Sequence, residues 1–154
     1  MIPAPLRGAC AVLGVAAMAA ATTSAAAAAD GAALFAQHCA TCHQADGSGT
    51  VGLAPPLKGA HWERLGADRG YLLAVVLNGL AGPIRIDGQP FVGAMPGFAA
   101  QLDDAQIAAV ASHLRTLQGA KDAAPYAAEE VKAARSLAGS PPASRPRRVQ
   151  LVGG

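Results

Sequence analysis

Residues 37–45 read Gln-His-Cys-Ala-Thr-Cys-His-Gln-Ala, with two cysteines separated by two residues and a histidine directly after the second. The 154-residue chain has one other cysteine, Cys10. Two thiols and an imidazole at this spacing are typical of three kinds of site: a covalently attached haem, a zinc site, or a redox-active disulfide. The sequence around the motif bears on the choice among them.

The N-terminal segment has the pattern of an export signal. One charged residue, Arg7, precedes an apolar stretch at residues 8–21 and a run of small residues at 22–29. A basic start, an apolar middle and an Ala-x-Ala exit are typical of a cleaved signal peptide, and the apolar stretch is shorter than the roughly 20 residues that span a bilayer. The alternative is a retained N-terminal anchor. The pattern predicts a signal peptide at residues 1–29 and a periplasmic mature protein from which Cys10 has been removed.

Net charge gives no reason to expect a nucleic-acid partner. Without Arg7 the chain has 11 basic and 10 acidic residues, far from the basic balance of a nucleic-acid-binding domain. Residues 30–118 hold seven acidic and five basic side chains, and residues 119–154 hold three acidic and six basic ones. Residues 119–154 are expected to form a C-terminal extension. It would comprise a short helix at 127–137 and a basic tail from Gly139 that is disordered or docks on an acidic protein or anionic lipid.

The position of His43 favours the haem interpretation of the motif. Cys39 and Cys42 can each add to one vinyl group of a haem, and a histidine directly after the second cysteine is then held at the iron as an axial ligand. A structural zinc site needs four ligands, and no second Cys-x-x-Cys pair occurs. A thioredoxin-type disulfide is found in a βαβ setting, of which the sequence shows no sign. The motif predicts one covalently bound haem c, with a zinc-binding or thiol module as the alternative.

A second axial ligand is expected from Met95, which is the one methionine after the signal segment. It lies in a loop, Gly93–Phe98, that is rich in glycine and proline and far from any apolar stripe. Methionine sulfur is a known axial ligand of c-type haem. His61 and His113 are rival ligands, whereas His38 is too close to the attachment site to reach over the haem.

Apolar periodicity and capping residues predict a mainly α domain at residues 30–118. Asp30 is expected to cap a helix that runs toward the cysteines, and a second helix is expected at residues 70–79, where a buried strand is the alternative. Residues 44–60 are rich in glycine and proline and predict an extended loop. An amphipathic helix is expected at residues 103–117, with acids at its positive end and an apolar stripe along one face.

Residues 83–92, Pro-Ile-Arg-Ile-Asp-Gly-Gln-Pro-Phe-Val, predict a β-hairpin. Two short runs flank Asp87-Gly88, a pair that suits a type I′ turn because both of its central residues need positive φ. Pro90 cannot donate a backbone hydrogen bond, which places its strand at an edge. Alanine is the most frequent apolar residue at residues 30–118 and large apolar side chains are few, so the core is thin and a bound cofactor would fill its centre.

The sequence CATCH at residues 39–43 and GAMPGF at residues 93–98, with the terminal helices, resembles a class I c-type cytochrome over residues 30–118. The resemblance implies a small cytochrome c fold, with three to four helices around one covalent haem and a short hairpin before the methionine loop. It also implies that a helix containing Gly31 and Phe35 crosses the last helix of the domain, where His113 stands in place of the family's usual aromatic residue.

The resemblance assigns roles to residues that follow the haem motif. The Pro55 carbonyl would accept a hydrogen bond from the second ring nitrogen of His43 and fix its orientation, and Leu57 would pack on the haem. Trp62 would either donate to a haem propionate or be an ordinary buried indole. Weaker candidates for the propionate role are Arg64, Arg69 and Tyr71.

Iron closed by His43 and Met95 would have no free site for substrate, so the expected function is one-electron transfer rather than catalysis. Residues 78–98 are similar to cytochrome c subunits that accompany exported dehydrogenases and reductases. The protein is expected to be a carrier or the cytochrome subunit of a redox enzyme, with a dehydrogenase or reductase and a terminal oxidase as partners. No nucleic acid and no transmembrane span in the mature chain are expected. The alternative function is a haem enzyme or gas sensor with an open or displaceable sixth site.

Overall fold

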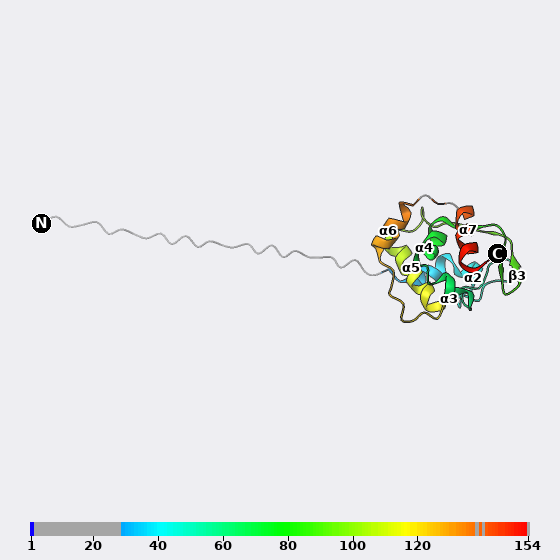
Figure 1. The fold of residues 1–154 in the computed structure, drawn as a ribbon. Coiled ribbons are helices and arrows are strands. Elements are labelled where there is room, and N and C mark those ends of the chain that lie inside the picture. The colour runs from blue at the N-terminus through cyan, green and yellow to red at the C-terminus, as the bar shows by residue number, and fades with distance from the viewer. Residues whose placement is uncertain (2–28, 138, 140, 154) are drawn as a thin grey trace.

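The computed structural model describes residue 1, residues 29–137, residue 139 and residues 141–153. The predicted signal peptide lies almost wholly outside the described residues. Within the described part the protein is mainly helical, as the sequence predicts, and it has two small antiparallel strand pairs. Helix α6 (Ala128–Arg135) packs against α5 (Asp104–Leu117), and α7 (Pro141–Val152) packs against α4 (Arg69–Asn78), as Figure 1 shows.

The expected number of helices, three to four, is wrong, because seven occur in the described part. The remaining three are α1 (Gly31–His38), α2 (Ala40–His43) and α3 (His61–Leu65). Helices α2 and α3 have only four and five residues. Such short helices depend on tertiary contacts rather than on propensity, and they leave no apolar period in the sequence.

Helices α1 and α5 cross closely, and each begins at an aspartate that caps it. Asp30 accepts hydrogen bonds from the backbone amides of the first turn of α1, and Asp103 forms a capping box at the start of α5. At the crossing, a Cβ on Gly31 would collide with the Ala109 carbonyl, so no side chain fits there. The ring of Phe35, which is 2% exposed, lies 5.3 Å from the ring of His113. The imidazole thus takes the place of the aromatic residue that the family resemblance implies.

Helix α4 passes through the centre of the core. Asp68 caps its first turn, and Gly79, with φ of 82°, ends it. The helix prediction for residues 70–79 is therefore confirmed, and the strand alternative is wrong. A helix that is buried on most of its circumference needs partners on all sides. The buried side chains of α4 are Tyr71, Leu72, Leu73, Val75, Val76 and Leu77.

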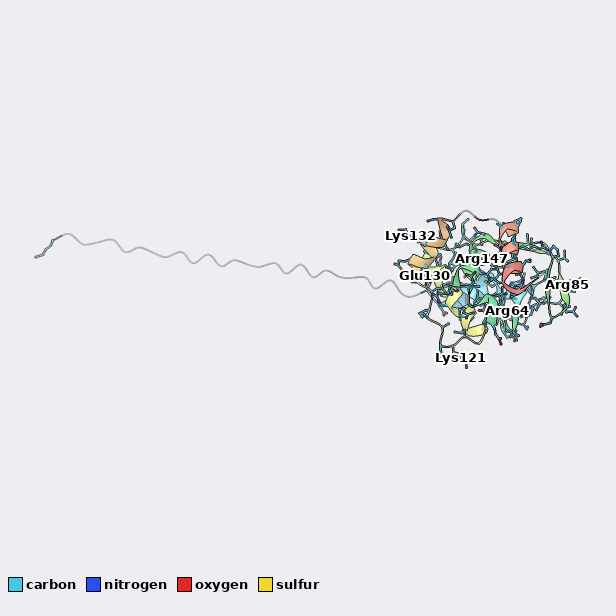
Figure 2. All side chains as sticks on the ribbon, viewed as in Figure 1. Arg64, Arg85, Lys121, Glu130, Lys132 and Arg147 are labelled. Carbon is cyan, nitrogen blue, oxygen red and sulfur yellow. The ribbon has the colours of Figure 1, made fainter. Side chains whose placement is uncertain are left out.

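The predicted hairpin is present as β2 (Ile84–Ile86) and β3 (Gln89–Phe91). Its turn residues, Asp87 and Gly88, both have positive φ, at 51° and 79°. Figure 2 shows Arg85 of β2 at the outer edge of the molecule. A second pair, β1 (Leu80–Ala81) with β4 (Ala94–Met95), was not predicted, because each strand has only two residues and the pairing needs the hairpin to bring them together.

The C-terminal extension, residues 119–154, is attached to the domain through arginine side chains. Arg69 of α4 binds the Glu130 carboxylate with Nε and Nη2, at 2.9 and 2.8 Å. Its guanidinium also lies 4.0 Å from the centre of the Tyr126 ring, a cation–π distance. Glu130 is labelled on α6 in Figure 2.

The expectation of a disordered tail is wrong for residues 141–152, which form α7. The segment has little apolar surface, but its arginines find partners on the domain. Arg147 pairs with Asp68 at 2.6 Å, and Nε of Arg145 donates to the Pro83 carbonyl at 2.8 Å. Prolines in the first turn of a helix are tolerated because that turn lacks intrahelical amide bonds. None of the helices in the described residues is long and apolar enough to cross a membrane.

Candidate haem site

A largely apolar cavity of about 210 Å³ lies between α4, the strand pairs and the Cys-x-x-Cys-His segment. One water molecule needs roughly 10–15 Å³ of such space, so the cavity has room for a much larger ligand. Both cysteines of the motif, His43 and Met95 line it, and so do Pro55, Leu57 and Trp62. The structure therefore brings these seven predicted residues to one cavity.

The two thiols lie where α1 ends and α2 begins. Cys39 caps both helices, so that Cys42 and His43 follow on the same helical face, three and four residues later. Both thiols are free in the described structure. Burial raises the pKa of Cys39 to about 11, and the neighbouring Cys42 adds to the rise. Redox-active cysteines have lowered pKa values, so this environment does not suit a thiol–disulfide enzyme.

His43 is held in one orientation by the loop that follows it. The imidazole is 7% exposed, and its Nδ1 lies 2.9 Å from the Pro55 carbonyl oxygen. This is the contact that the family resemblance implies. Nδ1 then carries the proton, and Nε2 keeps its lone pair for a metal. Burial lowers the pKa of His43, with the Pro55 hydrogen bond acting in the opposite direction, which favours the neutral, ligating form.

The loop itself is ordered by backbone contacts to the motif. The Thr50 hydroxyl donates to the Cys42 carbonyl at 2.9 Å, and the amide of Gly49 donates to the His43 carbonyl at 2.9 Å. Gly49 has a φ of +78°, and a Cβ there would lie 2.7 Å from the carbonyl carbon of Pro55. Glycine is therefore required for the close approach that sets Pro55 beside His43.

Met95 reaches the cavity from β4, where it pairs with Leu80 of β1. The amide of Phe98 donates to the Val76 carbonyl at 2.9 Å, which fastens the methionine loop to the end of α4. A Cβ on Gly79 would collide with the Met95 carbonyl, so the two segments are in direct backbone contact. These contacts place the half-buried Met95 side chain on the cavity that His43 also lines.

The other histidines are placed differently. His113 contacts Phe35 at the helix crossing and does not line the cavity. His38 lines it with its ring 6.0 Å from that of Phe98. His61 lines it too, with Nε2 lying 3.3 Å from the Pro56 carbonyl.

The candidates for propionate binding separate into two groups. Trp62 and Tyr71 line the cavity, and the indole N–H of Trp62 donates to the Pro56 carbonyl at 3.3 Å. Arg69 is turned to the C-terminal extension and does not line the cavity, so it is wrong as a candidate. Arg64 lines a separate polar cavity of about 440 Å³.

A charged residue of the cavity was missed by the sequence prediction. Arg148 of α7 is 4% exposed and lines the cavity. In the sequence it is one of three arginines in a segment rich in proline and serine, which is typical of a solvated tail. No local signal distinguishes it from Arg145 or Arg147.

Residues 28–118 match the family model for cytochrome c, and the chain belongs to that family. It is 46% identical over 114 residues to cytochrome c-552 of Thermus thermophilus, covering 70% of this chain and 86% of that protein. It is 35% identical over 108 residues to the gluconate 2-dehydrogenase cytochrome c subunit of Pantoea cypripedii, covering 68% of this chain and 24% of that protein. It is 35% identical over 99 residues to the Cbb3-type cytochrome c oxidase subunit CcoP of Azospirillum sp. (strain B510), covering 60% of this chain and 29% of that protein.

Family membership assigns covalently bound haem c as the cofactor and electron transfer as the general function. The residues fit this group: two thiols separated by two residues, an imidazole with one nitrogen held by the Pro55 carbonyl, and an apolar cavity. They do not suit a structural zinc ion, since no three histidine, cysteine, aspartate or glutamate side chains of the described residues form a metal-binding group.

Proposed function

We propose that this protein transfers single electrons in the periplasm through one haem whose iron is ligated by His43 and Met95. The observation that carries the proposal is that both side chains line the cavity that also holds Cys39 and Cys42. Residues 30–118 would form the cytochrome domain, and residues 119–154 an extension of it. The role is that of a carrier or a cytochrome subunit rather than an enzyme, because no coordination site is left for substrate.

Haem supplies a one-electron Fe(III)/Fe(II) couple, and the protein sets its potential. Cys39 and Cys42 tether the macrocycle, and the Pro55 carbonyl increases the basicity of His43. The neutral, soft sulfur of Met95 favours the ferrous state and raises the reduction potential relative to a second histidine. Apolar side chains, Leu57 among them, exclude water and penalise the additional positive charge of the ferric state.

The cavity rim supports exchange of electrons with other redox proteins. Leu53 lines the cavity and is nevertheless 61% exposed, and Val51 and Val92, which are close in sequence to cavity-lining residues, are 93% and 71% exposed. Apolar groups at the rim suit small, transient interfaces of below about 1,200 Å². Because similar proteins include a dehydrogenase subunit and an oxidase subunit, we propose a dehydrogenase or reductase as donor and a terminal oxidase as acceptor.

The ligand assignment is tested with Met95→Ala in protein matured with haem. We expect the substitution to abolish the weak long-wavelength sulfur–iron band of the ferric spectrum and to let the ferrous protein bind carbon monoxide. The wild-type ferrous protein should bind no carbon monoxide at neutral pH. Persistence of the band in the variant would overturn the assignment. Carbon monoxide binding by the wild type would favour a haem enzyme or gas sensor.

A further inference from the structure

One arginine of the C-terminal extension is buried at the haem cavity without an anionic partner. Arg148 is 4% exposed, and its Nη2 has no hydrogen-bond partner in the described structure. On the same helix, Arg147 is paired with Asp68 and Arg145 with the Pro83 carbonyl. A buried guanidinium that lacks a counter-charge is strongly unfavourable. An anion at this position would remove that penalty.

The surroundings of Arg148 mark a polar end of the cavity. His61 of α3, whose buried Nδ1 is also without a partner, and Tyr71 of α4 line the same cavity. Burial raises the pKa of Tyr71, and the nearby Arg148 guanidinium offsets part of the rise. His61 and Arg148 also line the adjoining polar cavity of about 440 Å³. These two side chains therefore lie at the boundary between the apolar cavity and a polar one.

Among the described residues, no carboxylate forms an ion pair with Arg148. Glu63 and Asp87 line the adjoining polar cavity together with Arg64 and Arg85. Neither acid forms an ion pair with Arg148 among the pairs of the described residues. Because Arg148 lines the apolar cavity, the occupant of that cavity is in a position to supply the anion.

Haem c offers carboxylates at one edge only. The thioethers to Cys39 and Cys42 form at the vinyl groups, and the two propionates extend from another part of the macrocycle. Guanidinium and carboxylate groups form charge-assisted, often bidentate hydrogen bonds. We propose that Arg148 binds a haem propionate, so that α7 completes the haem site from outside residues 28–118, the part that matches cytochrome c. The inference rests on covalent haem but is independent of ligation by Met95.

The pairing has a consequence for the reduction potential. A positive charge that neutralises a propionate disfavours the ferric state, so its removal should lower the potential. A propionate left in the cavity without Arg148 should also gain protons more readily, because burial disfavours the ionised form. The potential of such a variant should then rise as pH falls, whereas the paired site should show a weaker dependence.

The first test compares wild type, Arg148→Gln and the control Lys132→Gln, which removes an exposed positive charge of α6, by spectroelectrochemistry of the haem-loaded proteins across a pH series. We expect Arg148→Gln to lower the ferrous-to-ferric ratio at a fixed applied potential about three- to tenfold at alkaline pH, where tenfold corresponds to 59 mV for one electron. We expect it also to steepen the pH dependence. Lys132→Gln should follow the wild type. Curves for Arg148→Gln that superimpose on those of the wild type would overturn the proposal.

The second test needs no variant and so remains decisive if Arg148→Gln fails to fold. Nitrogen-15 NMR of wild-type protein should show Arg148 guanidinium protons that exchange slowly and shift between the ferrous and ferric states. Arg85, on the exposed hairpin, serves as the internal reference. Exchange of the Arg148 protons as fast as those of Arg85 would overturn the proposal. The sulfur–iron band is a separate readout, so failure of the Arg148 pairing and failure of Met95 ligation are distinguishable.

Discussion

Replacement of Gly31 by alanine tests whether the crossing of α1 and α5 determines the stability of the domain. An alanine Cβ would lie 2.7 Å from the carbonyl carbon of Ala109 and 3.1 Å from Cβ of His113. The first neighbour is backbone and cannot rotate away, so the helices must separate. Separation would also loosen the contact between the rings of Phe35 and His113.

Two opposing effects set the size of the change. Overpacking of a tight contact costs typically about 1–3 kcal/mol, whereas alanine is favoured over glycine within a helix by up to about 1 kcal/mol. Residue 31 is the first residue of α1, where the propensity gain is smaller. The steric cost should therefore exceed the gain, and Gly31→Ala should lower the free energy of unfolding by about 1–2 kcal/mol.

The assay is denaturant unfolding of the haem-loaded ferric protein, followed by far-ultraviolet circular dichroism and by Soret absorbance. Ala33→Gly is the matched control, since Ala33 is exposed on the same helix and its substitution changes backbone propensity alone. We expect Ala33→Gly to lower the free energy of unfolding by about 0.5–1 kcal/mol. If Gly31→Ala is as stable as the wild type or more stable, the helices do not need the close approach and the reasoning is refuted.

Two further substitutions test the extension and the cavity rim. The Arg69 guanidinium holds the pKa of Glu130 below its usual range, so the pair stabilises the fold above the ordinary glutamate pKa and is lost as pH falls through the lowered value. Because both side chains are more than one third exposed, Glu130→Gln should lower the free energy of unfolding by at most about 1 kcal/mol at neutral pH. In denaturant unfolding, this difference between variant and wild type should vanish in acid. A difference that persisted in acid would contradict this account. Leu53→Glu should slow electron self-exchange by about tenfold, as measured by NMR line broadening at low ionic strength. Leu137→Glu should leave the rate unchanged, because Leu137 is similarly exposed but does not line the cavity. Equal rates for the two variants would exclude the rim as the contact surface.

The sequence predicts those parts of the fold that carry strong local signals. Capping aspartates and an apolar stripe predict residues 103–117 as a helix, and α5 spans Asp104–Leu117. Asp87-Gly88 predicts the hairpin turn because few residue pairs tolerate positive φ at two successive positions. Helices α2 and α3 and the strand pair β1–β4 are too short to leave such a signal.

The same distinction applies to the site. The spacing of Cys39, Cys42 and His43 is a local property and could be interpreted directly. Met95 could be predicted as a site residue because it is the one methionine of its region of the chain, and the structure places it on the cavity. The burial of Arg148 could not be predicted, since it depends on a cavity that α3, α4 and the strands build at a distance in sequence. Arg69 was assigned wrongly for the same reason, because its partners lie beyond residue 118.

Because ion pairs attach the C-terminal extension to the domain, the strength of this attachment should depend on salt concentration. In the part of the chain that the structure describes, three partly exposed ion pairs join the domain and the extension: Arg69–Glu130, Arg135–Asp104 and Arg147–Asp68. Mobile ions screen such pairs, whereas contact between apolar side chains is not weakened in this way. Raising ionic strength should therefore loosen the last two helices before it disturbs the domain, so that a salt effect on the electron-transfer rate could arise inside this protein as well as at its interface with a partner.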